Sequence, residues 1–230
     1  KDYYKHLDKN LGEIISVCPK DIVFIIASDH GMNRLDGRIN LNDWLVEKGY
    51  LIFNDSYLEK ARVNGPVKFN AKEIDWKKTR VFATSAYEAS VFINREAVMD
   101  SEYDSFCEKI SKEIADIPGK DGKRLNTQVF KTADIYKNKS NENTPDMIVY
   151  FDDLFWGTNC DIGNKGLHSL SNLVGSDDAL HARKGIFIMA GEKIKARGEI
   201  KDISILDAAP MILNLFDLKK EAGMDGKAIC

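Results

Sequence analysis

Five consecutive residues, Ser28-Asp29-His30-Gly31-Met32, carry the strongest chemical signal in this chain. They follow residues 21–27, an apolar and β-branched run whose length suits a buried strand. Open α/β sheets place ligands at the carboxyl ends of parallel strands, where Asp29 and His30 would offer oxygen and nitrogen to a divalent metal such as Zn²⁺. Gly31 would let the backbone turn sharply. The alternative is an ordinary strand-to-loop turn, in which Asp and Gly are common.

The other histidines are His6, His168 and His181. His6 lies among charged residues of an amphipathic segment, which is typical of a solvated surface position. His181 follows a loop that carries Asp177 and Asp178 and comes shortly before a second apolar run. Carboxylates and an imidazole next to a buried strand are a suitable context for a metal, although a single histidine is usually structural.

The composition is that of an ordinary globular protein of 230 residues, with 43% hydrophobic and 30% charged residues and a net charge of −3. Nothing in this charge balance favours binding to a nucleic-acid polymer. The sequence has no apolar run of the roughly 18 residues that a bilayer-spanning helix needs, and no signal-peptide pattern. We therefore expect no membrane segment in this chain.

The four cysteines do not form a C-x-x-C pair and are too sparse for a disulfide framework, so we expect free thiols. The compartment stays open, with the cytoplasm favoured.

Hydrophobic periodicity and turn residues predict an alternation of helices and strands. Helices are expected at 3–17, between Asn40 or Asn42 as N-cap and Gly49 as the C′ residue, at 101–117, and at 202–216 with Pro210 in the first turn or starting a new helix. Strands are expected at 22–27, 80–84, 90–94, 128–130, 147–151 and 185–191. Surface loops are expected at 138–143 and 158–179.

Four segments in order resemble the alkaline phosphatase superfamily, most closely its type I phosphodiesterase/nucleotide pyrophosphatase-like branch of phosphohydrolases and phosphomutases. They are Ser28–Met32, Asn40–Leu51, Gly175–His181 running on to Gly185-Ile186-Phe187, and Asp207–Leu213 with Met224-Asp225-Gly226. Each is weak alone, but their common order makes the resemblance fairly specific. It covers essentially the whole chain and matches the C-terminal half of the family.

The resemblance implies a site with two divalent metal ions, zinc in the first place and manganese as an alternative. Asp29 and His30 match the Asp-His pair that binds one metal, and His181 matches the histidine that binds the other. Asp177 and Asp178 would orient His181 as outer partners or simply face water. His168 is a candidate for contact with substrate.

The remaining parts of the family's site are an early metal-binding Asp, a Thr or Ser nucleophile and an Asp-x-x-x-His pair. Nothing in residues 1–28 matches them, so we expect the nucleophile upstream and interpret the chain as the C-terminal portion of a longer enzyme. A helix followed by a strand is also only half of a βαβ unit. If the chain proved active alone, Ser28 or Thr158 would be the candidate nucleophiles.

The resemblance implies an α/β fold: an α/β/α sandwich with a mainly parallel sheet, interrupted by a small α+β insertion. We expect the core at 1–51 and 166–230 and the insertion at 52–165, with the upstream half of the catalytic domain absent. His30 and His181 would meet at one site despite their separation in sequence.

The favoured function is hydrolysis of phosphodiester or nucleotide pyrophosphate bonds by in-line displacement at the two-metal site. The alternatives are a phosphomutase of the same superfamily and a non-catalytic binding or structural domain that keeps the fold. The expected partners are a small phosphate ester or nucleotide, and either the missing N-terminal half or a self-association partner at the exposed sheet edge. The substrate is not specified, because the insertion and the upstream half would determine it.

Overall fold

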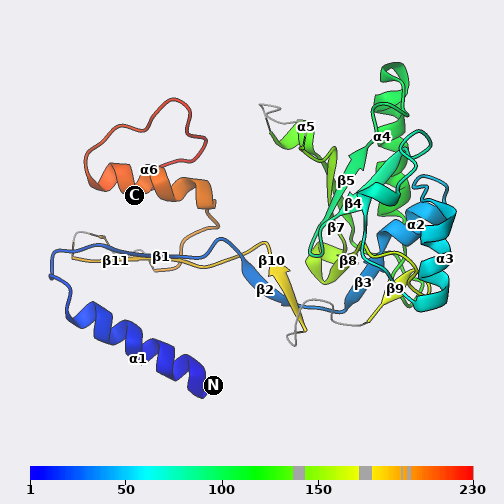
Figure 1. Ribbon diagram of the computed structural model, residues 1–230. Helices are drawn as coiled ribbons and strands as arrows, with labels where there is room; N and C mark the ends of the chain where they lie inside the picture. Colours follow the sequence, from blue (N-terminus) through cyan, green and yellow to red (C-terminus); the bar gives the residue numbers. More distant parts are fainter. Residues whose placement is uncertain (137–142, 171–177, 193, 196–197, 230) are drawn as a thin grey trace. The chain divides into compact units, whose positions relative to one another are not determined.

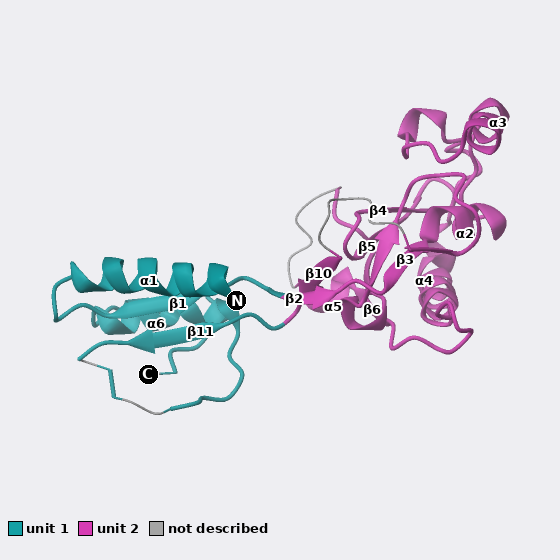
Figure 2. Ribbon diagram, turned by 90° about the horizontal axis from the view of Figure 1, so that it is seen from below, with its two compact units in different colours: residues 1–31, 184–230 teal, residues 32–183 magenta. Residues whose placement is uncertain are grey.

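The computed structural model describes residues 1–136, 143–170, 178–192, 194–195 and 198–229 (Figure 1). The chain divides into two compact units (Figure 2), the first made of 1–31 and 184–230 and the second of 32–183. The sequence analysis instead divides the chain into a core and an insertion, with boundaries at 51/52 and 165/166. That division stays a prediction. No described helix is long and apolar enough to cross a bilayer.

The first unit combines two strands from opposite ends of the chain with two longer helices. Its elements are α1 (Asp2–Ser16), β1 (Phe24–Ala27), β11 (Phe187–Ala190), the 3₁₀ turn η3 (Ile205–Asp207) and α6 (Ala208–Leu215). The strands β1 and β11 are antiparallel, with Phe24 opposite Ala190 and Ala27 opposite Phe187. The expected helix at 3–17 and the expected strands at 22–27 and 185–191 are therefore confirmed.

The helix α1 has the predicted apolar stripe, but none of its residues is buried. Its large side chains remain exposed, among them Leu7, Leu11, Ile14 and Ile15. An amphipathic stripe normally faces a core. In the first unit, the apolar stripe of α1 is exposed and does not face a core.

The Asp207 carboxylate joins the C-terminal segment around Lys227 to the start of α6, and we call this contact the clip. Asp207 accepts hydrogen bonds from the backbone N–H groups of Ser204 (2.9 Å) and Lys227 (2.7 Å). Gly226 permits this close approach, because a Cβ there would lie 1.9 Å from the carbonyl oxygen of Leu206. Pro210 lies in the first turn of α6, as expected.

The second unit contains most of the buried hydrophobic side chains and is built from fifteen described elements. They are β2 (Gly31–Arg34, whose first residue belongs to the first unit), β3 (Gly37–Asn40), α2 (Leu41–Glu47), α3 (Asp55–Asn64), η1 (Ala71–Glu73), β4 (Val81–Thr84), β5 (Ala89–Ile93), α4 (Asp100–Ala115), β6 (Gln128–Lys131), α5 (Thr132–Ile135), β7 (Met147–Tyr150), η2 (Asp152–Leu154), β8 (Trp156–Asn159), β9 (His168–Ser169) and β10 (Ala179–Ala182).

The largest sheet has the strand order β4-β5-β7-β6, and every pair in it is antiparallel. The strands β4, β5 and β7 alternate buried and half-buried residues, so one face forms a core, whereas all four residues of β6 are half-buried. The helix α4 covers this sheet with Phe106, Cys107, Ile110 and Ile114 (Figure 1). These elements match the expected strands at 80–94, 128–130 and 147–151 and the expected helix at 101–117.

Two smaller sheets carry residues of the family resemblance. β3 lies between β8 and β9, parallel to β8 and antiparallel to β9, and β10 pairs with β2. The helix α2 follows β3 directly, with Asn40 at the N-cap and Gly49 at a positive φ of 72° just beyond the helix. This helix therefore begins and ends as the sequence predicts.

The mixed α/β character is confirmed, but the mainly parallel sheet is not. Among the described pairs whose direction is defined, only β3–β8 is parallel. Residues 22–27, expected as a buried parallel strand, instead pair antiparallel with β11 and are half-buried to exposed. An apolar run predicts a strand, but it does not define the direction of the neighbouring strand.

The long loop expected at 158–179 is only partly a loop. It contains the end of β8, the short β9 and the start of β10, while 171–177 lie outside the described residues. Of the loop expected at 138–143, only Asn143 lies within the described residues, in a turn.

Candidate functional site

Asp29 and His30 lie in the short link between β1 and β2, as expected for residues at a strand's carboxyl end. The Nδ1 atom of His30 bonds the Gly31 carbonyl at 2.9 Å. Because a carbonyl oxygen only accepts, Nδ1 must carry the proton in this bond. The other ring nitrogen, Nε2, lies 3.7 Å from Oδ1 of Asp29. The same carboxylate oxygen accepts the backbone N–H of His30 at 3.1 Å.

These two donors fit part of a divalent-metal site. Two ligands of one tetrahedral zinc lie about 3.3 Å apart, since each bond is about 2.0 to 2.1 Å long. The Nε2–Oδ1 separation is close to this value, and both donor types suit Zn²⁺. In the described part of the chain no group of three His, Cys, Asp or Glu residues could hold a metal. The donor types and spacing fit, whereas a catalytic zinc normally has three protein ligands.

Ser28 and Gly185 bring the two strands of the first unit together next to this pair. Ser28 Oγ accepts the N–H of Ile186 at 2.8 Å, and the N–H of Ser28 donates to the carbonyl of Ile186 at 3.0 Å. A Cβ at Gly185 would lie 2.4 Å from Ser28 Oγ. Gly185 is therefore needed for this close approach. Gly31 begins β2 without a positive φ, and the chain bends before it, at Asp29.

His181 lies on β10, half-buried, with its ring stacked on that of Tyr87. The ring centroids are 4.4 Å apart and the planes differ by 11°. His30 belongs to the first unit and His181 to the second. The expectation that both imidazoles serve one two-metal site therefore stays a prediction.

The carboxylates expected to orient His181 are only partly described. Asp178 is exposed, and its backbone carbonyl accepts the N–H of Leu35 at 2.8 Å. Asp177 lies outside the described residues. The outer-partner role of both residues stays a prediction.

His168, the candidate for substrate contact, has two structural contacts. Its Nε2 donates to the carbonyl of Pro118 at 2.8 Å, and its ring meets the edge of Trp156 with centroids 5.3 Å apart. In β9 it stands opposite Ile39 of β3. These contacts join β9 to other elements of the second unit, and the role toward substrate stays a prediction.

Thr158 is one of the two hydroxyl residues proposed as fallback nucleophiles. It is fully buried in β8, and its Oγ1 has no hydrogen-bond partner in the described structure. The other, Ser28, already accepts a backbone N–H through its hydroxyl oxygen. Within the described residues, neither hydroxyl is hydrogen-bonded to a histidine, the arrangement that usually activates a serine or threonine.

A comparison with protein-family models places this geometry in context. The model of type I phosphodiesterase / nucleotide pyrophosphatase matches residues 1–177. The chain belongs to this family. The family lies in the alkaline phosphatase superfamily and indicates a hydrolase of the phosphodiesterase or pyrophosphatase type. The matched range includes Asp29, His30 and His168, while His181 follows its end. Comparisons with curated proteins and with solved structures found no match.

In this phosphodiesterase-family chain, the Asn-Leu-Asn-Asp segment at 40–43 has a structural role that the sequence analysis missed. Asn42 bonds both backbone groups of Ala83, each at 2.9 Å, and Asn40 bonds the Gly166 carbonyl at 2.8 Å. Asp43 accepts the N–H groups of Gly163 and Asn164. The sequence indicates Asn40 or Asn42 as the helix cap and places both in a segment of the family resemblance, but it does not predict these contacts. The sequence did contain a signal for these contacts. Three polar residues stand at the start of a largely buried helix, and buried polar side chains need hydrogen-bond partners.

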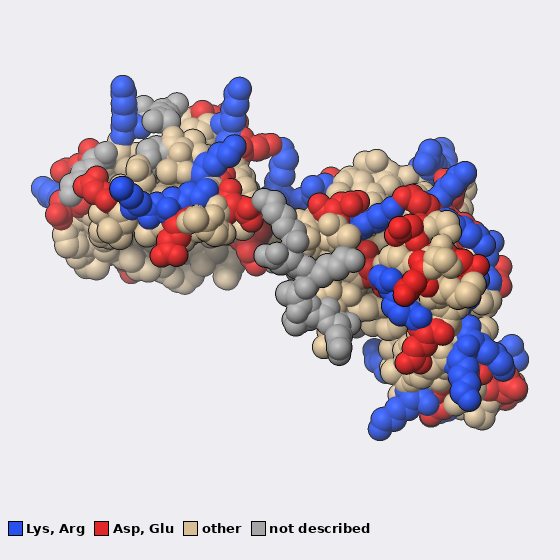
Figure 3. Space-filling model, turned by 90° about the horizontal axis from the view of Figure 1, so that it is seen from above, with Lys and Arg blue, Asp and Glu red and all other residues tan. Residues whose placement is uncertain are grey.

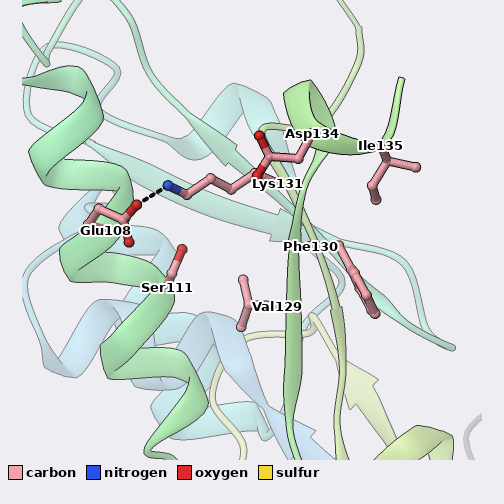
Figure 4. A pocket seen from close by; sticks show the side chains of 7 residues that line it. All are labelled: Glu108, Ser111, Val129, Phe130, Lys131, Asp134 and Ile135. Atoms are coloured by element: carbon pink, nitrogen blue, oxygen red, sulfur yellow. Dashed lines mark hydrogen bonds and ion pairs between the residues drawn. The ribbon is translucent and has the colours of Figure 1, made fainter. Parts of the chain in front are cut away.

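A hollow of about 390 Å³ in the second unit contains none of the predicted site residues (Figure 4). It is lined by Glu108, Ser111, Val129, Phe130, Lys131, Asp134 and Ile135. Lys131 is ion-paired with Glu108, and that hydrogen bond raises the pKa of the lysine above its usual value. Ser111 donates to the sulfur of Met147 at 3.0 Å. In this hollow, Lys131 and Glu108 are thus engaged with each other, and Ser111 is engaged with Met147.

Proposed function

We propose that this chain is the C-terminal portion of a metal-dependent phosphoesterase that hydrolyses phosphodiester or nucleotide pyrophosphate bonds. One observation carries the proposal beyond family membership. The Gly31 carbonyl holds the Nδ1 proton of His30, and Nε2 lies 3.7 Å from the Asp29 carboxylate. This is the arrangement of a histidine ligand whose tautomer is fixed by its other nitrogen.

In this proposal Asp29 and His30 bind one divalent ion and His181 contributes to binding a second. When bound, such a metal pair lowers the pKa of the nucleophile and neutralises charge on the attacking and leaving oxygens. The residues on this chain bind the metal ions and orient the ligand side chains. The Gly31 carbonyl fixes the proton of His30 on Nδ1, so that Nε2 carries the lone pair, and Asp29 supplies the negative charge. Zinc suits this donor set, with manganese as the alternative.

The nucleophile and the remaining ligands are proposed to lie in a preceding part of a longer protein. The residues described here supply two donors to one metal and one to the other. The proposal therefore includes that the 230-residue chain alone binds metal weakly and does not turn over phosphodiesters.

The proposed substrate is a small phosphate ester or nucleotide. The face shown in Figure 3 carries acidic and basic side chains interspersed, and ion pairs such as Lys68–Asp161 and Arg124–Asp116 join the two signs. A mixed surface of this kind does not favour the many phosphates of a nucleic-acid polymer over one small anion.

A steady-state assay tests the function. The 230-residue chain and the longer protein that contains it are each incubated with bis-p-nitrophenyl phosphate and added Zn²⁺ or Mn²⁺. The proposal predicts metal-dependent turnover by the longer protein and none by the chain alone. The chelated protein serves as the control.

Three results would contradict the proposal in different ways. Transfer of phosphate between positions of a sugar phosphate, without release of a leaving alcohol from diesters, would identify a phosphomutase. Metal-bound longer protein without activity toward diesters, pyrophosphates or monoesters would identify a non-catalytic domain. Robust turnover by the chain alone would place the nucleophile on it, with Ser28 and Thr158 as the first residues to replace.

A further inference from the structure

The tip of the β4–β5 hairpin lies directly against His181. Tyr87 belongs to this tip, residues 85–88, and its ring covers one face of the His181 imidazole at 4.4 Å and 11°. Tyr87 is 37% exposed, so its ring is not simply core filling. A residue from a distant hairpin thus sets the plane of a predicted metal ligand.

Face-to-face stacking restricts a histidine without occupying its nitrogens. The lone pair of an imidazole nitrogen lies in the ring plane, whereas the stacking partner occupies the region above that plane. A stacked ring can still rotate within its plane, but it cannot tilt freely. Tyr87 therefore limits the directions in which His181 offers its nitrogens.

Three hydrogen bonds hold the hairpin tip, two of them to its backbone. The Cys160 thiol donates to the Ser85 carbonyl at 3.1 Å, and the Ser85 hydroxyl bonds the Glu88 carboxylate at 3.2 Å. Arg38 donates to the carbonyl of Ala86, the residue before Tyr87. Ser85 adopts a positive φ of 80°, an uncommon conformation that such contacts must maintain.

Arg38 itself is well fixed beneath this tip. Its side chain is 1% exposed, and the same Nη1 also donates to the Thr158 carbonyl at 3.2 Å. Gly157, its neighbour in the β3–β8 pair, makes the room, because a Cβ there would lie 2.9 Å from Nη1. Burial lowers the pKa of the guanidinium, and the interaction with Tyr87 opposes that effect.

We propose that Tyr87 is a positioning residue for His181, presented by a hairpin tip that Arg38 and Cys160 hold in place. Its effect on metal binding rests on the proposed function, while its effect on the ring orientation does not. The expected outcome of losing the aromatic ring is a reoriented imidazole and a weaker second metal site.

The first measurement is an NMR spectrum of the 230-residue chain labelled in its histidine rings, in wild type, Tyr87→Ala and Tyr87→Phe. His181→Gln identifies the His181 signals. A stacked aromatic ring shields protons that lie over its face. We expect the His181 ring protons to move downfield in Tyr87→Ala and to stay in place in Tyr87→Phe, while those of His168 remain unchanged in both.

The second measurement is Zn²⁺ affinity of the longer protein with the same variants. Removing an outer partner of a metal ligand typically weakens affinity or activity by about 10- to 100-fold. We expect a loss of this size in Tyr87→Ala and recovery in Tyr87→Phe, because the phenyl ring retains the stack.

The two measurements separate the inference from the function on which it rests. Unchanged His181 signals in Tyr87→Ala would overturn the positioning role whatever the metal data show. If His181→Ala kept full Zn²⁺ affinity, the metal assignment would fail, although the ring orientation by Tyr87 could still stand. If His181→Ala lost affinity and Tyr87→Ala kept it, the stack would have no influence on the site.

Discussion

The two imidazoles proposed as metal ligands are held in different ways. His30 is oriented within its ring plane by a hydrogen bond to Gly31, and His181 is oriented across its plane by the Tyr87 ring. The first arrangement selects a tautomer, and the second selects a tilt. Neither contact alone determines where the metal-binding nitrogen points. We expect other ligands of the metal to fix that direction.

Residue types could be predicted from the sequence better than their partners. Asp29 and His30 stand out because two good donors directly follow an apolar run, and their contact is local. The stacking of Tyr87 on His181 was not predictable, because it depends on a hairpin turning back toward a distant strand. His168 stood out only by its type, and its bond to Pro118 could not be anticipated.

Thiol reactivity gives a prediction at this scale. Burial raises the pKa of Cys160 to about 12 and also raises that of Cys107, so both thiols stay protonated at pH 8. The thiolate is the reactive form. We expect a maleimide reagent to label Cys18 in the native chain well before these two. Peptide mapping by mass spectrometry locates the label, and urea-unfolded chain is the control. Equal native labelling of all three would contradict the assigned burial.

At the scale of elements, long periodic segments were predicted well. The helices at 3–17 and 101–117 and the strands around 81–93 have strong patterns and appear as expected. The short strands β2, β3, β8, β9 and β10 were missed, because two to four residues give too little pattern. Strand direction was missed because it depends on the partner strand. The parallel arrangement was predicted from the apolar run at 21–27, from the interpretation of helix and strand as half of a βαβ unit, and from the resemblance.

The clip between η3 and the C-terminal segment has a defined pH dependence. Two backbone N–H groups donate to the Asp207 carboxylate and lower its pKa below the ordinary value of about 3.9. A carboxyl whose pKa is lower when folded stabilises the fold above its unfolded pKa. That contribution is lost as the pH falls through the folded pKa.

We therefore expect amide exchange near Lys227 to accelerate as the pH falls below about 3.9, after correction for intrinsic exchange rates. In Asp207→Asn this segment should exchange faster at neutral pH, with little further change in acid. The control is Asp217→Asn, which alters an exposed carboxyl near the end of α6. Equal protection at Lys227 in wild type and Asp207→Asn would contradict the clip.

At the scale of the whole molecule, buried apolar surface is distributed unequally. The hydrophobic core cluster belongs to the second unit, while the first unit exposes the apolar stripe of α1 and a sheet of two described strands. A two-stranded sheet is at best marginally stable in water unless other elements cover it. We propose that the first unit is completed by the upstream half of the protein or, without it, by self-association.

The proposal predicts that the 230-residue chain self-associates with rising concentration. Light scattering after size exclusion should show the mean mass rising above the 25.9 kDa of the monomer. The double variant Leu11→Glu with Ile14→Glu should reduce this rise, because it places charge on the α1 stripe. The control is Val63→Glu, at a site of the second unit that is 71% exposed. An equal effect of both variants would argue against the α1 stripe as the contact.

The most direct test of the central claim is the metal content of the longer protein, measured by elemental analysis together with phosphodiester turnover. Wild type, His30→Ala and His6→Ala are compared, since His6 is an exposed histidine of α1. Because His30 is half-buried in a link outside the core cluster and makes a hydrogen bond to the Gly31 carbonyl, its replacement should change stability by only about 1 kcal/mol. We expect two metals per chain in wild type and His6→Ala. In His30→Ala we expect loss of one metal or both, with activity reduced more than about 100-fold. Two metals and normal turnover in His30→Ala would contradict the account.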